Sequence, residues 1–133
     1  MRWFTPCALA LLVLPMAAAA QSLAPQTRWV NNHGSELVIE SIGPDGRLTG
    51  TYSSSAPGYK CRGIAFPIVG WVDGERIAYT MQARNGSADC GTMTSWTGYL
   101  QGGRLYAEWS LAYFDTEANR PMLDRGTDIY RPK

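Results

Sequence analysis

Turn signals occur at short, regular intervals along the sequence, and almost no stretch has helical periodicity. The clearest signals are Pro44-Asp45-Gly46, Asp73-Gly74 and Gly102-Gly103, where glycine accepts a positive φ without steric penalty. Short strands separated by tight turns are typical of an all-β sandwich or barrel. The pattern therefore favours a fold built from consecutive β-hairpins.

Eight strands are expected, joined mostly by short connections. They cover residues 27–33, 35–42, 47–55, 63–72, 75–83, 92–100, 104–113 and 126–131. Longer loops are expected between the third and fourth strands and at 84–90, and a short helical turn limited by Pro121 is expected between 116 and 124. Strands in this number suit an antiparallel up-and-down β-barrel, which removes sheet edges by closing on itself. A two-sheet sandwich is the alternative.

The N-terminal segment differs in character from the rest of the chain. Arg2 supplies a short positive region, and an apolar stretch ends in Ala18-Ala19-Ala20, a small-residue cleavage site. This pattern predicts a cleaved signal peptide over residues 1–20 and a single folded domain over residues 21–133, in a secreted or periplasmic protein. A transmembrane anchor is the alternative, but the apolar run is short for a bilayer.

Removal of the signal changes both the charge and the cysteine count. The chain has 12 Lys and Arg against 11 Asp and Glu, so loss of Arg2 leaves 11 of each sign and no electrostatic reason to bind nucleic acid or a membrane. Cys7 lies inside the signal, which leaves Cys61 and Cys90 as an even pair that predicts a disulfide. One histidine and two distant cysteines are too few ligands for structural zinc, so no metal is expected.

Alternate residues of a strand face the same side, so each predicted strand divides into two sets. The sets that combine aromatic side chains with small polar ones are Trp29, Asn31, His33 and Ser35; Gly50, Tyr52, Ser54 and Ala56; Thr92, Thr94, Trp96 and Gly98; and Leu105, Ala107, Trp109 and Leu111. Burial of tryptophan directs these sets inward, where an unpaired hydroxyl costs on the order of 1 to 3 kcal/mol. Hydroxyls that await a ligand explain the pattern; an exposed face is the alternative.

Six short motifs follow one another along the mature chain. They are Trp29–Ser35, Pro44–Tyr52, Ser95–Gly98, Trp109–Leu111, Thr116–Asn119 and Gly126–Tyr130. Together they resemble the avidin and streptavidin family, with the closest pattern in its dimeric, rhizavidin-like bacterial members. The resemblance implies an eight-stranded barrel that binds biotin non-covalently and with high affinity in its open end, with biotin as the ligand and no cofactor.

The resemblance also implies a role for each matching residue. Donors to the ureido oxygen of biotin are expected at Asn31, Ser35 and Tyr52, and acceptors for the two ureido nitrogens at Ser54 and Asp128. Thr94 is expected at the ring sulfur and Thr92 at the valerate carboxylate. The expected apolar walls are Trp96, Trp109 and Leu111, and the residues expected next to the ligand are His33, Ser55, Ala56 and Ala83.

Three positions depart from the family pattern. Ala83 stands where the family usually has a tryptophan wall, so weaker binding or a bulkier ligand is expected unless Tyr79 or Arg84 fills the gap. His33 replaces an apolar or small polar residue, and ligand contact or pH sensing is the alternative to a solvated side chain. Pro121 stands where streptavidin has a tryptophan that enters a neighbouring subunit, which favours a homodimer over a homotetramer.

An enzyme is not expected, because the chain has no paired histidine and serine in a recognisable motif, no metal cluster and no phosphate loop. The competing function is an exported small barrel whose rim serves as a protein-interaction or inhibitor module. Tyr99, Tyr106 and Tyr113 are expected on the outer face of the barrel, where they are consistent with a subunit interface.

Overall fold

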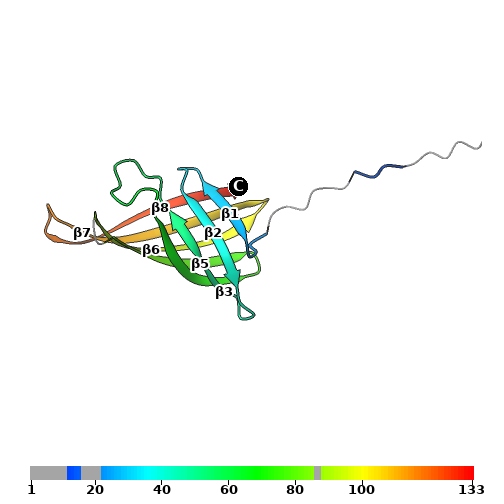
Figure 1. The fold of residues 1–133 in the computed structure, drawn as a ribbon, viewed down its shortest axis with the longest axis horizontal. Coiled ribbons are helices and arrows are strands. Elements are labelled where there is room, and N and C mark those ends of the chain that lie inside the picture. Colours follow the sequence, from blue (N-terminus) through cyan, green and yellow to red (C-terminus); the bar gives the residue numbers. More distant parts are fainter. Residues whose placement is uncertain (1–11, 16–21, 86–87) are drawn as a thin grey trace, which may run out of the picture.

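The computed structural model describes residues 12–15, 22–85 and 88–133, and the described strands form one closed antiparallel barrel (Figure 1). The strands are β1 (Thr27–Asn31), β2 (Glu36–Ile42), β3 (Arg47–Ser53), β4 (Ala65–Asp73), β5 (Arg76–Asn85), β6 (Ala88–Gln101), β7 (Arg104–Asp115) and β8 (Arg120–Pro132). Each strand pairs with its neighbours in sequence, and β1 also pairs with β8. The predicted up-and-down barrel is therefore confirmed, and the sandwich is excluded.

Most of the predicted signal peptide lies outside the described residues, so it stays a prediction. Within the described part of the chain, no helix has the length and apolar character needed to cross a membrane.

The largest correction to the predicted strands concerns β8, which begins at Arg120 rather than at residue 126. The expected helical turn over 116–124 is wrong, because the Asp115 side chain accepts hydrogen bonds from the backbone N–H groups of Glu117 and Ala118, both at 2.9 Å, and stabilises a tight turn. The chain then returns along β7 and pairs Pro121 with Phe114. Proline is tolerated in this position because it lies near the end of the strand.

The β5–β6 connection is also shorter than expected. The two strands continue to Asn85 and Ala88, so residues 84–90 are mostly strand rather than a long loop; residues 86 and 87 lie outside the described part. The predicted disulfide between Cys61 and Cys90 is present, with a Cα–Cα distance of 5.9 Å. It joins the β3–β4 loop to strand β6, whereas a link between two loops was expected.

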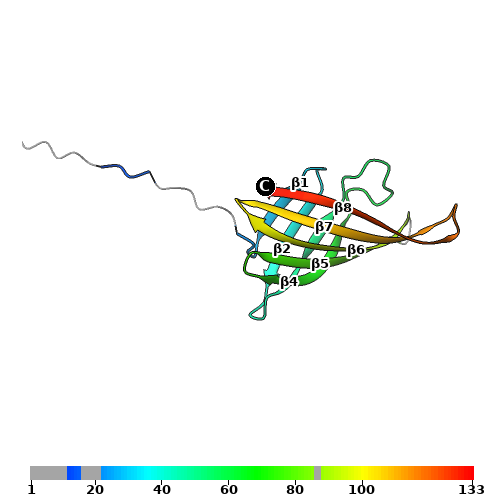
Figure 2. The ribbon, with the colours of Figure 1, turned by 180° about the vertical axis from the view of Figure 1, so that it is seen from behind.

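The two ends of the barrel differ in what fills them. The side chains that pack the half nearest the β2–β3, β4–β5 and β6–β7 turns are apolar and buried: Trp29, Ile39, Leu48, Ile77 and Leu105. At the opposite end the β5–β6 and β7–β8 hairpins extend beyond the barrel, and the β3–β4 loop lies beside them (Figures 1 and 2). Because the apolar core fills one end of the barrel, the interior of the other end stays open to a ligand.

Tyrosine orientation agrees only in part with the sequence expectation. Tyr99 and Tyr106 lie on the outer face and stack with their ring centroids 5.6 Å apart. Tyr113 shares the inward parity of Trp109 and Leu111 and is half-buried, so its expected place on the outer face is wrong.

Candidate functional site

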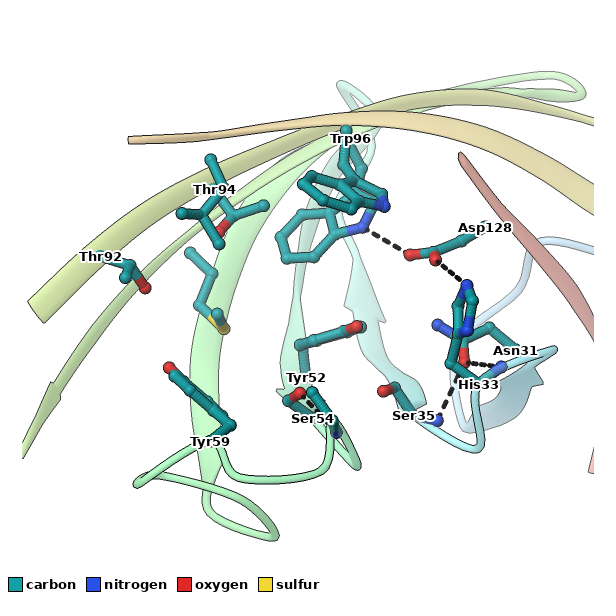
Figure 3. Close-up of a pocket in the computed structure, with 14 residues that line it drawn as sticks. Asn31, His33, Ser35, Tyr52, Ser54, Tyr59, Thr92, Thr94, Trp96 and Asp128 are labelled. Carbon is teal, nitrogen blue, oxygen red and sulfur yellow. Dashed lines mark hydrogen bonds and ion pairs between the residues drawn. The ribbon is translucent and has the colours of Figure 1, made fainter. Parts of the chain in front are cut away.

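A cavity of about 310 Å³ occupies the open end of the barrel (Figure 3). Its lining residues are Asn31, His33, Ser35, Tyr52, Ser54, Ala56, Tyr59, Met81, Thr92, Thr94, Trp96, Trp109, Leu111 and Asp128. Every residue that the sequence predicted as a direct ligand contact lies on this surface, together with His33 and Ala56. A cavity of this size suits one small molecule.

The side chain of Asn31 is oriented by the backbone of the β1–β2 turn. Its Oδ1 atom accepts hydrogen bonds from the N–H groups of His33, at 3.0 Å, and Ser35, at 2.9 Å. Because Oδ1 is occupied, the amide group presents Nδ2 as its free donor. Nδ2 is buried and has no hydrogen-bond partner among the described residues, a condition that costs about 1 to 3 kcal/mol unless a ligand supplies an acceptor.

Ser35 provides a second donor beside Asn31. Its Oγ atom accepts a hydrogen bond from the N–H of Ser55 at 2.9 Å, which leaves the hydroxyl proton of Ser35 available. The Ser55 hydroxyl donates to the Gly34 carbonyl at 2.9 Å, and Ser55 does not line the cavity, contrary to expectation. Ser55 instead links the β3–β4 loop to the β1–β2 turn.

Tyr52 brings a phenol to the same end of the cavity. Burial, which is the largest effect, raises the pKa of Tyr52 above its usual value of 10. The phenol therefore stays protonated at physiological pH and can donate a hydrogen bond.

Two acceptors face these donors. Asp128 is buried, and its Oδ2 atom accepts hydrogen bonds from Trp96 Nε1 at 3.0 Å and from the Tyr130 hydroxyl at 3.3 Å. Its Oδ1 atom lies 3.9 Å from His33 Nε2 at the cavity edge (Figure 3). Ser54 Oγ accepts from the Ala56 N–H at 3.2 Å and keeps a second lone pair. Oδ1 and Ser54 Oγ are thus the acceptors left for a ligand.

The threonine hydroxyls lie at the other end of the cavity. Figure 3 shows Thr92 and Thr94 on β6, away from Asn31 and Asp128. The Oγ1 atom of Thr92 is buried without a hydrogen-bond partner in the described part of the chain. The cavity therefore has a dense polar cluster at one end and hydroxyls at the other.

Residues 19–132 match the family model described as the Avidin family. The chain belongs to the avidin family. It is 29% identical over 136 residues to afifavidin from Afifella pfennigii, an alignment that covers 90% of this chain and 84% of the relative. Among solved structures it is similar to the bradavidin2–biotin complex, with 31% identity, a TM-score of 0.74, and coverage of 84% and 99%. The rhizavidin–biotin complex gives 28% identity, a TM-score of 0.75, and coverage of 83% and 92%.

In this member of the avidin family, the wall at the end of β5 differs from the sequence expectation. Ala83 is fully buried but does not line the cavity, and with Arg84 it borders a separate hollow. Tyr79 does not fill the gap either, because it packs outside the cavity and stacks on Trp96 with centroids 4.8 Å apart. Met81, which the sequence reasoning missed, supplies this wall. A long, flexible thioether side chain fills irregular space well.

Tyr59 is the second lining residue that the sequence reasoning missed. It belongs to the β3–β4 loop and lies two residues before Cys61, whose disulfide partner Cys90 lies two residues before Thr92. The disulfide therefore keeps the loop, and Tyr59 with it, beside the threonine end of the cavity. An aromatic residue next to a bridging cysteine was the available sequence signal.

The Trp109 wall depends on a glycine in the neighbouring strand. Trp109 pairs in register with Gly126 across β7 and β8. A Cβ atom added at Gly126 would lie 2.3 Å from Cζ2 and 2.6 Å from Cε2 of the indole ring. The indole therefore lies directly across residue 126, where a side chain cannot be placed without displacing it.

We expect Gly126→Ala to displace Trp109 and to destabilise the barrel by about 1 to 3 kcal/mol, as overpacking does. Gly91→Ala is the matched control, because a Cβ there meets no atom within 4 Å. Tryptophan fluorescence should change and the thermal midpoint should fall in Gly126→Ala only. Equal spectra and midpoints in the two variants would contradict the close packing of Trp109 on Gly126.

Proposed function

We propose that this protein binds biotin non-covalently and with high affinity in the open end of its barrel. The observation that carries the proposal is the set of unused hydrogen-bonding groups at one end of the cavity. The available donors are Asn31 Nδ2 and the hydroxyls of Ser35 and Tyr52; the available acceptors are Ser54 Oγ and Asp128 Oδ1. A ureido group offers one strong acceptor and two N–H donors, so this set leaves none of its polar atoms unpaired.

The rest of the cavity suits the remainder of the ligand. Trp96, Trp109, Leu111 and Met81 provide apolar surface for a bicyclic ring and an aliphatic tail. We assign Thr94 to the ring sulfur and the unpaired Thr92 hydroxyl to the carboxylate end. Polar groups that are already oriented by the barrel limit the ordering cost of binding, and exclusion of water strengthens each hydrogen bond.

The comparisons support the same assignment. The bradavidin2 and rhizavidin structures that resemble this chain are complexes with biotin. Membership of the avidin family also indicates a binding protein rather than an enzyme. Biotin is thus the ligand that fits both the polar groups of the cavity and the family.

Isothermal titration of the disulfide-bonded protein with biotin tests the proposal, and Asn31→Asp is the most informative variant. The substituted side chain would keep an oxygen to accept from the His33 and Ser35 N–H groups but replace the donor Nδ2 by an acceptor. We expect the wild type to show saturable binding and Asn31→Asp to bind about 100-fold more weakly, because a donor to the ureido oxygen becomes a repulsive lone pair.

The matched control for loss of a polar group is Ser95→Ala, which removes an exposed hydroxyl on the outward side of β6. It should bind biotin as the wild type does. Absence of saturable binding by the wild type at micromolar biotin, or equal affinities in wild type and Asn31→Asp, would refute the proposed function.

We also propose that two copies associate through the outer face of β4 to β8 (Figure 2). Trp71 and Tyr99 are 57% and 51% exposed there, and Ile129 is 39% exposed. Charged side chains of both signs, Arg76 and Glu108, border the same hollow. A patch that carries exposed apolar area together with charges of both signs suits a self-complementary, two-fold contact.

Trp71→Arg should convert this dimer to a monomer, because it places a charge in the apolar contact. Thr49→Arg, which adds the same charge to the exposed outer side of β3, should leave the dimer intact. Sedimentation equilibrium measures both masses. A monomeric wild type, or a Trp71→Arg variant that remains dimeric, would rule out this interface.

Export of the protein is a further part of the proposal. Residues 1–20 have the pattern of a cleaved signal, and the Cys61–Cys90 disulfide suits an oxidising compartment. Intact mass spectrometry of the full chain expressed in bacteria should find a periplasmic or secreted product that begins at Gln21 and contains no free thiol. A product that retains Met1 or Arg2 would argue against cleavage at this site.

A further inference from the structure

A chain of buried hydroxyl groups lies behind the cavity wall. The hydroxyl oxygens of Tyr79 on β5 and Tyr130 on β8 are 2.8 Å apart, and the Tyr130 hydroxyl lies 3.3 Å from Asp128 Oδ2. All of these side chains are buried. Neither Tyr79 nor Tyr130 lines the cavity, so neither can touch a ligand there.

The direction of this chain follows from counting protons. A phenol has one proton to donate, and a carboxylate only accepts. Because the Tyr130 hydroxyl donates to Asp128 Oδ2, it must accept from Tyr79, whose own proton therefore points to Tyr130. Burial is the main cause that raises the pKa values of Tyr79 and Tyr130 well above 10, so both phenols keep their protons.

Tyr79 supports the same carboxylate by a second route. Trp96 Nε1 donates to Oδ2 of Asp128 at 3.0 Å. Tyr79 stacks on one side of the Trp96 ring, with the ring centroids 4.8 Å apart and an interplanar angle of 14°. The Tyr52 ring also packs against Trp96, with the centroids 4.6 Å apart. With two donors on Oδ2, the carboxylate is fixed in one rotation and presents Oδ1 to the cavity.

We infer that Tyr79 and Tyr130 are positioning residues for ligand recognition, whose hydroxyl chain fixes Asp128 so that Oδ1 accepts from a ligand N–H group. The inference rests on the proposed function, because it assigns these residues to recognition of a ureido nitrogen. Loss of the Tyr130 hydroxyl leaves Oδ2 with the Trp96 donor alone. The carboxylate then rotates more freely, so Oδ1 is held less firmly toward the ligand.

The dependence on Asp128 separates this role from simple packing. The Tyr130 hydroxyl contacts Asp128 directly, and the Tyr79 hydroxyl reaches it through Tyr130. A residue that acts by orienting the carboxylate loses its effect on binding when the carboxylate is removed, whereas a packing effect persists. An Asp128→Ala background therefore distinguishes the two roles.

The test measures biotin affinity by isothermal titration at pH 7 in the wild-type and Asp128→Ala backgrounds. We expect Tyr130→Phe to weaken binding about tenfold in the wild-type background and to have no further effect in the Asp128→Ala background. Tyr79→Phe should weaken binding about threefold. Because the effect of the Tyr79 hydroxyl passes through Tyr130, the double variant should bind no more weakly than Tyr130→Phe alone.

Tyr113→Phe is the control, because Tyr113 lies on β7 and does not line the cavity; it should leave the biotin affinity unchanged. Thermal unfolding identifies the temperature below which all variants are folded. Wild-type binding by Tyr130→Phe, an equal loss from Tyr130→Phe in the Asp128→Ala background, or additive losses in the double variant, would overturn the inference and leave the proposed function intact. Failure of the unsubstituted protein to bind biotin would overturn both.

Discussion

The pairing of β1 with β8 is the interaction on which the site depends. It places Asn31 opposite Tyr130, and the Asn32 side chain accepts a hydrogen bond from the Ile129 N–H at 3.1 Å across the same seam. These residues lie near opposite ends of the amino-acid sequence of the folded domain. Closure of the sheet thus brings the donors of the first hairpin to the carboxylate of the last strand, in addition to removing the sheet edges.

The inward residues could be predicted from the sequence because a slip of one residue in β1, β6 or β7 would turn Trp29, Trp96 or Trp109 outward. The β7–β8 turn was harder to predict, since the Asp115 side chain favours a tight turn in a segment where a short helical turn limited by Pro121 was expected. The wall beside Ala83 could not be predicted for a different reason. An alignment assigns positions, but the reach of the Met81 side chain and the path of the loop that carries Tyr59 are decided by packing.

The polar end of the cavity illustrates how a barrel interior tolerates groups that a sealed core would exclude. Asn31, Ser35 and Ser54 each have one hydrogen bond or more to backbone within the described structure, which orients the side chain and leaves a defined donor or acceptor unused. The unpaired Asn31 Nδ2 and Thr92 Oγ1 atoms lower the stability of the empty barrel. The general rule that buried polar atoms have hydrogen-bond partners fails in the region where a ligand would supply those partners.

The Cys61–Cys90 disulfide closes a loop with a sequence separation of 29 residues and attaches the cavity rim to strand β6. Cross-linking of this kind restricts the conformations of the segment before any ligand arrives. Much of the entropy that an untethered rim would lose on enclosing a ligand is therefore already lost when the protein is oxidised. In thermodynamic terms, thiol oxidation and ligand binding are linked through the conformational freedom of one loop.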